Sequence, residues 1–281
     1  MKTAKVVLPL LLCLFLSAFT YPGKKNHWKK LYDGRNLTGW DVYIGPDLDN
    51  DGKPITGKPL GLNNDPRFVF TIVKDEGEKV IRVSGQNWGA ISTHKEYEDY
   101  HLHLMFKWGK LQWGQKKGKK KDSGVLYHSV GNYGADYGAW MRSQEFQIEE
   151  GNCGDYWGVA GGMADIKADK KSESEYVYNP QGKLTVFSEH SEAGRHCIKN
   201  GDAEKPTGGW NTLDLYCHGD TSIHVINGKV MMVLYHNRQM DNGKEQPLTK
   251  GKIQIQSEGA EVFYKDIIIQ PIDQLPAELL K

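Results

Sequence analysis

Short segments in which apolar and polar residues alternate recur along the whole chain. Alternation places every second side chain on the same face of an extended backbone, so each segment predicts a β-strand with one buried face. Gly, Asn and Asp separate the segments and predict turns, most sharply at Asn227-Gly228, where both residues tolerate the positive φ of a two-residue hairpin. The expected strands are Phe68–Val73, Val80–Val83, Tyr100–Trp108, Gly124–Val130, Ser143–Glu149, Lys183–Ser188, Asn211–His218, Ser222–Ile226, Val230–Tyr235, Lys252–Gln256 and Val262–Pro271.

Helical periodicity is absent except for one turn expected at Gln274–Leu280. Many short strands separated by turn signals are typical of an all-β antiparallel sandwich or barrel. Residues 44–66 are rich in Gly, Pro, Asp and Asn and predict an irregular insertion. Within it, residues 47–52 resemble a calcium loop only weakly, because the bidentate Glu and the flanking helices are missing.

The strand expected at 143–149 carries an acidic strip. Glu145, Gln147 and Glu149 fall on one face, and Phe146 and Ile148 fall on the other. Two carboxylates and an amide on an apolar backing are suited to hydrogen-bonding sugar hydroxyls and to acid–base chemistry. The strip therefore predicts a carbohydrate site.

The first twenty residues have the features of a cleaved signal peptide. A positive start is followed by an apolar run and then by small residues, with cleavage expected near Ala18 to Thr20. The apolar run is too short for a membrane span. We therefore expect export to the periplasm or the medium and a single domain over residues 21–281, with no membrane span. The formal net charge of +1 gives no bulk attraction to nucleic acid.

Three cysteines remain after the signal peptide is removed. Cys217 is in phase with Leu213 and Leu215, which predicts a buried strand position, whereas Cys153 and Cys197 lie in polar or Gly-rich sequence and could form a disulfide. The basic run at 116–121 predicts a solvated loop, with steering of an anionic substrate as the alternative.

Seven segments in a fixed order resemble one known family. They are Trp28–Trp40, Tyr97–Leu104, Asp122–His128, Glu145–Glu150, Gly209–Thr212, His224–Gly228 and Gly251–Ile269. Together they are similar to the 3-keto-disaccharide hydrolase domain, formerly a domain of unknown function, over nearly all of residues 21–281. The resemblance implies a concanavalin-like jelly-roll sandwich of two antiparallel sheets with a concave sugar site. It also implies cleavage of glycosides already oxidised to a ketone at carbon 3.

Two segments depart from the family pattern. Many members carry Asn-Ser-Gly and a strand ending in Arg, whereas this chain has Asp122-Ser-Gly and His128. Many also carry a His before the Gly of the last motif, where this chain has Glu258. The chain therefore resembles a sub-branch of the family.

The acidic strip fits keto-sugar chemistry better than ordinary glycosidase chemistry. On a regular strand the Cα atoms of Glu145 and Glu149 are about 13 Å apart, and glycosidase carboxyl groups lie about 5–9.5 Å apart. In the family pattern the second acidic position aligns with Glu150, and a β-bulge after Ile148 would bring Glu150 to the site face. Both residues therefore stay candidates.

A 3-keto sugar acidifies its carbon-2 proton, so a base can start an elimination that is completed by hydration. We assign Glu145 and Glu149 or Glu150 as base and acid, Gln147 as a hydroxyl or carbonyl contact, and His128 as enolate partner or proton relay. The expected substrate-binding neighbours are Gln256, Glu258, Trp140, Trp157 and His224, the last of which also fits a packed structural histidine.

No metal site is predicted. His101 and His103 share a strand face without a third ligand, although a divalent ion would be compatible with enolate chemistry. The other interpretations that remain open are an ordinary concanavalin-fold glycoside hydrolase and a non-catalytic carbohydrate-binding domain. The leading interpretation requires no other cofactor, but it requires a carbohydrate substrate and an upstream sugar oxidoreductase to make the ketone.

Overall fold

The computed structural model describes residues 28–281, which form two antiparallel sheets packed face to face. The larger sheet contains, in spatial order, β12 (Tyr176–Tyr178), β11 (Gly162–Lys170), β17 (Lys229–Asp241), β16 (Thr221–Ile226), β15 (Asn211–His218), β7 (Tyr100–Gln112), β20 (Ala260–Pro271), β5 (Glu78–Val83) and β4 (Phe70–Asp75). On its margins β1 (Lys29–Lys30) pairs with β20, β13 (Lys183–Phe187) with β11, and β18 (Lys244–Pro247) with β17.

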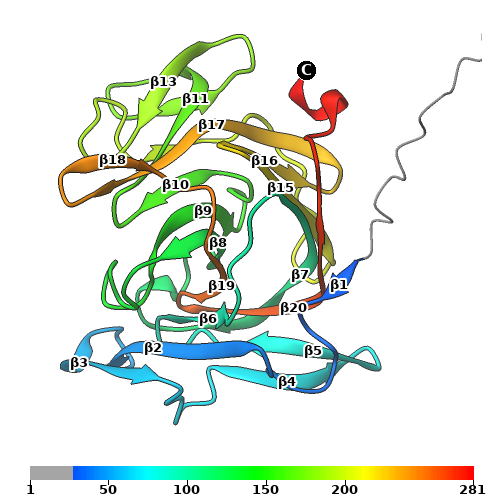
Figure 1. Ribbon diagram of the computed structural model, residues 1–281. Coiled ribbons are helices and arrows are strands. Elements are labelled where there is room, and N and C mark those ends of the chain that lie inside the picture. Colours follow the sequence, from blue (N-terminus) through cyan, green and yellow to red (C-terminus); the bar gives the residue numbers. More distant parts are fainter. Residues whose placement is uncertain (1–27) are drawn as a thin grey trace, which may run out of the picture.

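The smaller sheet contains β14 (His196–Cys197), β10 (Tyr156–Val159), β9 (Arg142–Glu149), β8 (Asp122–Val130), β19 (Lys252–Ser257), β6 (Gly89–Thr93), β2 (Trp40–Leu48) and β3 (Pro54–Leu62). Figure 1 shows β8, β9 and β19 between the end of the molecule formed by β11, β13 and β18 and the end formed by β2–β5. Two 3-10 helices, η1 (Gly114–Lys116) and η2 (Ala277–Leu280), complete the regular structure described. The predicted concanavalin-like jelly-roll sandwich is confirmed.

The core follows from the alternation in the sequence. Leu213, Leu215 and Cys217 of β15 are buried and their neighbours are half-exposed. Phe146 and Ile148 of β9 pack into the same core cluster from the smaller sheet. Their burial turns the alternate residues Glu145, Gln147 and Glu149 to the outer face of that sheet.

Every expected strand overlaps an observed one, and the Asn227-Gly228 turn has positive φ at both residues. The strands that the pattern did not reveal include β6, which is buried along its whole length and therefore does not alternate. β2 and β3 were also missed, because Gly, Pro and Asp interrupt them.

The prediction of an irregular insertion at 44–66 is wrong, because most of this segment forms the β2–β3 hairpin. Its acidic residues have structural partners. Asp47 accepts two hydrogen bonds from Arg67, and an Asp49 oxygen accepts the backbone N–H groups of Asp51 and Lys53. The segment is therefore a hairpin with a side-chain-stabilised turn.

A disulfide between Cys153 and Cys197 is not formed, because both thiols are free and buried in different places. Cys153 belongs to the main core between the sheets, and Cys197 belongs to a second cluster beneath β11 and β12. The proposed signal peptide lies outside the described residues. Within residues 28–281, the only helices are short and none has the length or apolarity to cross a membrane.

Candidate functional site

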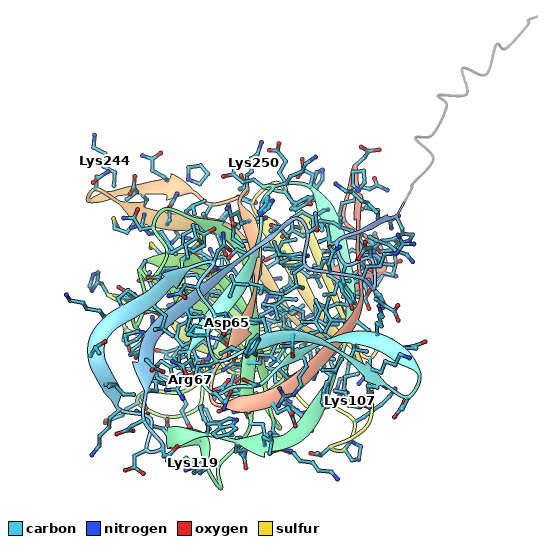
Figure 2. The ribbon with its side chains drawn as sticks, turned by 90° about the horizontal axis from the view of Figure 1, so that it is seen from below. Asp65, Arg67, Lys107, Lys119, Lys244 and Lys250 are labelled. Carbon is cyan, nitrogen blue, oxygen red and sulfur yellow. The ribbon has the colours of Figure 1, made fainter. Side chains whose placement is uncertain are left out.

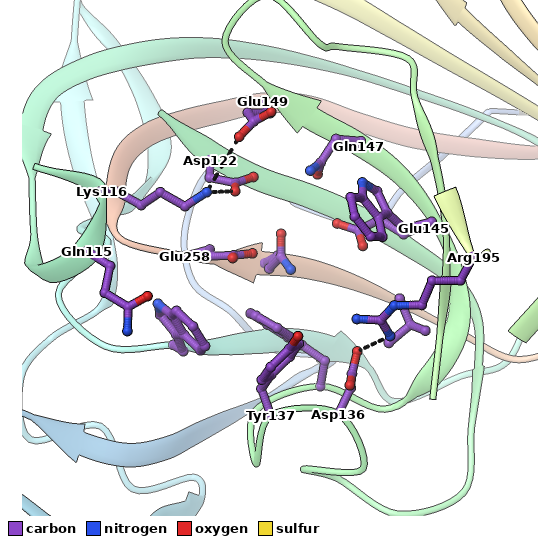
Figure 3. Close-up of a pocket in the computed structure, with 15 residues that line it drawn as sticks. Gln115, Lys116, Asp122, Asp136, Tyr137, Glu145, Gln147, Glu149, Arg195 and Glu258 are labelled. Atoms are coloured by element: carbon purple, nitrogen blue, oxygen red, sulfur yellow. Dashed lines mark hydrogen bonds and ion pairs between the residues drawn. The ribbon is translucent and has the colours of Figure 1, made fainter. Parts of the chain in front are cut away.

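A cavity of about 360 Å³ lies on the outer face of the smaller sheet (Figure 3). Its floor comes from β8, β9 and β19, and loops at both ends supply the walls. The lining residues are Trp88, Gln115, Lys116, Asp122, Asp136, Tyr137, Trp140, Glu145, Gln147, Glu149, Trp157, Val159, Arg195, Gln256 and Glu258. Ten of these are charged or amide side chains, which makes the cavity strongly polar.

The strand register aligns three carboxyl groups in one row across the floor. Asp122 of β8 pairs with Glu149 of β9. On the other side Val125 pairs with Ile255, and continuing this register places Glu258 opposite Asp122. Lys116, which ends η1, contacts Asp122 and lies 3.5 Å from Glu149. We call this row and its lysine the acid row.

Burial keeps the acid row partly protonated. Burial raises the pKa of Asp122 to about 7, although the neighbouring Lys116 ammonium lowers it. Burial, followed by repulsion from Asp122, raises the pKa of Glu258 well above its ordinary range. Repulsion between neighbouring carboxylates disfavours the ionised forms of Asp122 and Glu258 together. The acid row can therefore donate a proton at neutral pH.

The next row of the floor is uncharged. Gln147 pairs with Gly124, and the register places Gln256 on the other side of this glycine. The Oε1 atoms of both glutamines are buried without a hydrogen-bond partner within residues 28–281, as is one carboxyl oxygen of Asp122. Buried polar atoms in native proteins normally have a partner. These three orphan acceptors therefore favour a ligand rich in hydroxyl groups.

Within residues 28–281, Glu145 is a floor carboxyl group without a hydrogen-bond or ion-pair partner. Its side chain is 6% exposed, and no hydrogen bond joins it to the described part of the chain. Burial, assisted by the charge of Asp122, raises the pKa of Glu145 well above its ordinary range. A buried carboxyl group with a raised pKa is a stronger base when it ionises.

The Glu145 side chain occupies space that is free only because residue 124 is glycine. A Cβ atom on Gly124 would lie 2.3 Å from a Glu145 carboxyl oxygen and 2.9 Å from the Gln256 Oε1 atom. The Glu145 side chain thus leans over the bare backbone of Gly124 toward the middle of the floor. A side chain at position 124 would occupy that space.

Gly124→Ala is expected to lower kcat/KM by about 10²-fold through misplacement of Glu145. The atoms in the way are the ends of flexible side chains, so the fold should tolerate the methyl group. Thermal unfolding should therefore give a Tm within a few degrees of that of the parent protein. Unchanged activity would show that the close approach of Glu145 to Gly124 has no role in turnover.

The end of the cavity opposite Lys116 is built around Arg195. Its guanidinium donates to Asp136 at 3.0 Å and lies over the rings of Trp157 and Tyr137. Figure 3 shows Arg195 and Lys116 at opposite ends of the cavity, with the floor residues between them. We call the two ends the arginine end and the lysine end.

Aromatic rings form the remaining wall. Trp88 stacks on Trp140 with ring centroids 5.5 Å apart, and Tyr137 meets both rings edge-on. Trp157 stacks on His196 at 4.2 Å. The wall presents π-faces of the kind on which sugar rings and aromatic groups pack. Trp140 and Trp157, which the sequence nominated, both line the cavity with Glu145, Glu149, Gln147, Gln256 and Glu258.

Three residues that the sequence predicted for the site, Glu150, His128 and His224, do not line the cavity, so their assignment to the site is corrected. Glu150 follows the end of β9, accepts a hydrogen bond from Thr207 and lies 3.6 Å from Lys121. The bulge that would have turned Glu150 inward is absent, because Asp122–Tyr127 pairs in regular register with Gln144–Glu149. Glu149 is therefore the residue that faces the cavity.

His128 and His224 are both enclosed by protein. A register shift between Tyr127 and Val130 takes His128 out of the alternation, and its Nδ1 atom lies 3.0 Å from the Leu248 carbonyl oxygen. His224 stacks on Phe146 between the sheets. Burial lowers the pKa of His128 to about 4 and that of His224 to about 3. Both imidazoles are neutral structural groups.

His101 and His103 are also accounted for. Both contact the same oxygen of Asp214, at 2.7 and 2.8 Å, on the outer face of the larger sheet. Within residues 28–281 no group of three or more His, Cys, Asp or Glu side chains has a metal-binding arrangement. In the acid row, the cation between the carboxyl groups is Lys116.

The sequence missed the residues of both ends of the cavity. The expected strand began at Gly124, and β8 begins at Asp122, which extends the alternation by one position on the site face. Lys116 was assigned to a solvated run, which is correct for Lys119 at the edge of the molecule (Figure 2) but wrong for Lys116. Arg195 and Asp136 lie in loops without a repeating pattern, so no sequence signal marked them.

The two departures from the family pattern turn out to be neighbours. Asp122 stands where many members have Asn, Glu258 stands where many have His, and the register places the two opposite each other. The two departures therefore fall in one unit of the site, where two carboxyl groups face each other.

The fold and the cavity define this protein as a concanavalin-like sandwich with a polar, aromatic-walled sugar-type site. Residues 27–270 match the family of 3-keto-alpha-glucoside-1,2-lyase-like domains. The chain belongs to this family, and its domain is carbohydrate-active.

Solved structures with related folds have low sequence identity to the chain. A candidate glycosyl hydrolase from Parabacteroides distasonis is 18% identical, with a TM-score of 0.46 over 88% of this chain and 94% of that chain. A protein of unknown function with a galectin-like fold from Bacillus subtilis is 10% identical, with a TM-score of 0.47 over 87% and 94%. A carbohydrate-binding module from Bacillus subtilis is 7% identical, with a TM-score of 0.39 over 72% and 91%. No curated protein matches the chain at a significant level.

Proposed function

We propose that this protein cleaves 3-keto-glycosides by eliminating the glycosidic oxygen across carbons 1 and 2, followed by hydration. The observation that carries the proposal is the position of Glu145. It is a buried carboxyl group without a fixed partner, and it lies between a guanidinium at one end of the cavity and the proton-rich acid row at the other. The family description as a 1,2-lyase-like domain supports the same bond cleavage.

The order of these groups matches the order of the reacting atoms. Carbon 3 carries the ketone, carbon 2 carries the acidic hydrogen, and carbon 1 carries the leaving oxygen. A sugar lying along the cavity would present its ketone to Arg195, its carbon-2 hydrogen to Glu145 and its glycosidic oxygen to Asp122. This orientation replaces His128 by Arg195 as the partner of the enolate oxygen.

The first step is a β-elimination. Glu145 takes the proton from carbon 2, and the electron pair of that C–H bond forms an enolate whose oxygen on carbon 3 is stabilised by the guanidinium. The ketone then re-forms, a double bond forms between carbons 1 and 2, and the glycosidic oxygen leaves with a proton from the acid row. The products are an alcohol and an unsaturated 3-keto sugar.

The second step restores a saturated sugar. Water adds its oxygen to carbon 1 of the unsaturated ketone and gives one proton back to the acid row, and carbon 2 regains the proton that Glu145 holds after the first step. The sum of both steps is hydrolysis without a covalent enzyme intermediate. Gln147 and Gln256 would hydrogen-bond the sugar hydroxyls, since their orphan oxygens lie on the floor between the reacting groups.

An ordinary double displacement has weaker support. The regular pairing of β9 keeps Glu145 and Glu149 four residues apart on an unbroken strand, about 13 Å between Cα atoms. Glu145 leans over Gly124, and Glu149 lies near Lys116 in the acid row. The elimination needs no close pair of carboxylates.

The test is a comparison of two matched glucosides that differ only in the ketone at carbon 3. We expect release of the aglycone from the keto substrate and no release from the hydroxyl form, because only the ketone acidifies the carbon-2 hydrogen. Incorporation of deuterium at carbon 2 in D₂O provides a second measurement. Equal cleavage of both glucosides would reject the proposal in favour of an ordinary hydrolase, and cleavage of neither would favour a binding domain.

The proposal extends to the surroundings of the enzyme. The leader at residues 1–20 favours export to the periplasm or the medium. A sugar oxidoreductase must act first, because ordinary glycosides carry a hydroxyl group at carbon 3.

A further inference from the structure

A second cavity of about 300 Å³ adjoins the site. The β2–β3 hairpin supplies one side of it with Pro46, Leu48, Gly52 and Pro54. Trp88, Gln115 and Tyr137 form the other side, and these three residues also line the polar cavity. The two cavities are therefore adjacent and share one wall. We call the second one the hairpin cavity.

The chemistry of the hairpin cavity is opposite to that of its neighbour. No charged side chain lines it, and its polar side-chain groups are Gln115, the Tyr137 hydroxyl and the Trp88 indole N–H. A sugar ring placed there would leave most of its hydroxyl groups without partners, which costs free energy. A flat apolar group would instead pack against Leu48, the prolines and the Trp88 ring.

The aromatic side of the cavity is preorganised. Trp88 is held by the stacked Trp140 ring and by the edge of Tyr137, at centroid distances of 5.5 and 5.9 Å. Tyr137 is 65% exposed and adopts positive φ, a backbone conformation that costs free energy for a residue with a side chain. A strained, exposed aromatic residue at the junction of two cavities is typical of a ligand contact.

The hairpin side is held by backbone contact. A Cβ atom on Gly114 would lie 2.7 Å from the Gly52 Cα atom, so the hairpin turn and η1 approach more closely than side chains allow. Lys117 donates to the Asn50 carbonyl oxygen at 2.8 Å, and Asn87 donates to the Pro46 carbonyl oxygen at 3.1 Å. These contacts fix the position of the hairpin, so the shape of the hairpin cavity is set by the fold.

The position of the hairpin cavity relative to the acid row indicates which part of the substrate it would hold. Gln115 precedes Lys116, and Lys116 contacts Asp122 in the acid row. The Gln115 side of the hairpin cavity therefore borders the lysine end, where the glycosidic oxygen would leave carbon 1, and its Tyr137 side borders Arg195. A group attached to the leaving oxygen would reach the hairpin cavity past Gln115.

We propose that the hairpin cavity binds the aglycone of the substrate and that this enzyme prefers glycosides of flat apolar alcohols to disaccharides. The inference rests on the proposed function, because the elimination sets the direction of the sugar. It adds the class of leaving group, which the polar cavity alone does not specify.

The test uses the 2-phenylethyl and methyl 3-keto-α-glucosides, whose leaving groups are both simple alcohols. We expect a KM at least about tenfold lower for the phenylethyl compound, since burial of a phenyl ring is favourable. Leu48→Gln should raise the KM for the phenylethyl compound about tenfold and leave the methyl compound unchanged. Pro54→Ser, at an exposed position, gives a second variant that does not disturb the core.

The matched control is Leu62→Gln, the same change on the same hairpin at a residue that is 49% exposed and outside both cavities. It should behave as the parent protein. Equal KM values for the two glucosides, unaffected by Leu48→Gln, would overturn the inference while leaving the proposed function intact.

Binding of free 2-phenylethanol separates the two proposals. We expect saturable quenching of Trp fluorescence by this alcohol, weakened by Leu48→Gln but not by Leu62→Gln. If neither glucoside is cleaved, the proposed function fails, and Leu48-dependent binding would still support an apolar ligand in the hairpin cavity. Absence of both cleavage and binding would reject both proposals.

Discussion

Replacing Glu145 by Gln is expected to lower kcat for a 3-keto-glucoside by about 10²–10⁴-fold, the contribution of a positioned general base. Gln has nearly the same shape and cannot take a proton from carbon 2. The Glu145 carboxyl group is buried, makes no hydrogen bond or ion pair within residues 28–281, and has a raised pKa. Its replacement by a neutral amide should therefore not destabilise the fold. Sugar binding should therefore persist, and KM should change little.

Deuterium exchange at carbon 2 isolates the step that Glu145 performs. In D₂O the parent protein should label the substrate or product at carbon 2, and Glu145→Gln should lose both labelling and cleavage. Glu150→Gln is the matched control. It makes the same substitution at a residue that lies beyond the end of β9 and contacts Thr207. Labelling that survives in Glu145→Gln would show that another group is the base.

Asp122→Asn is the second substitution with a large expected effect, and its size should depend on the leaving group. If the acid row protonates the departing oxygen, kcat for a methyl glucoside should fall by about 10²–10⁴-fold. A 4-nitrophenyl glucoside, whose leaving group needs no proton, should lose much less. Equal losses on both substrates would contradict the assignment of the acid row as proton donor.

The raised pKa of Asp122 predicts how the reaction rate depends on pH. The pKa of Asp122 is raised to about 7, so the proton available for the leaving oxygen is present below pH 7 and is lost as the pH rises through that value. The rate on the methyl glucoside relative to that on the 4-nitrophenyl glucoside should therefore decline above about pH 7, because ionisation of the Glu145 base, whose pKa is also raised, affects both substrates alike. Because Asp122 and Glu258 are coupled, the midpoint belongs to the pair.

A double variant offers a rescue. The family pattern that the chain resembles has Asn at the position of Asp122 and His at the position of Glu258, so Asp122→Asn alone changes one member of two facing positions. The combination Asp122→Asn with Glu258→His should recover part of the lost rate, because an imidazole has an ordinary pKa of about 6.5 and can donate a proton. A double variant no better than Asp122→Asn would show that the two positions do not act together.

Alternation made the middle of the site predictable. Wherever one face of a strand packs on the core, the period of two assigns the other face, as for Glu145, Gln147 and Glu149 on β9 and for Gln256 on β19. The sandwich fold follows from the same pattern repeated along the chain. The order of the family-like segments determined which chemistry to expect.

The same rule failed where the backbone left the regular period. His128 would face the cavity by alternation, but the register shift beside Val130 turns it toward Leu248. The hairpin at 44–66 was hidden by residues that disfavour strands. Its role as a wall of the hairpin cavity depends on contact with η1, which is distant in the sequence.

The sequence by itself therefore determined the sheet sandwich, the acidic strip and the carbohydrate chemistry, because each depends on local period or on ordered motifs. Only the tertiary structure decided that Glu149 and not Glu150 faces the site, that Asp122, Glu149 and Glu258 form one row under Lys116, and that Arg195 closes the opposite end. These relations depend on strand register and on loops that meet across long sequence separations. Pairing and loop contact are set by the packing of the whole chain, and no local pattern encodes them.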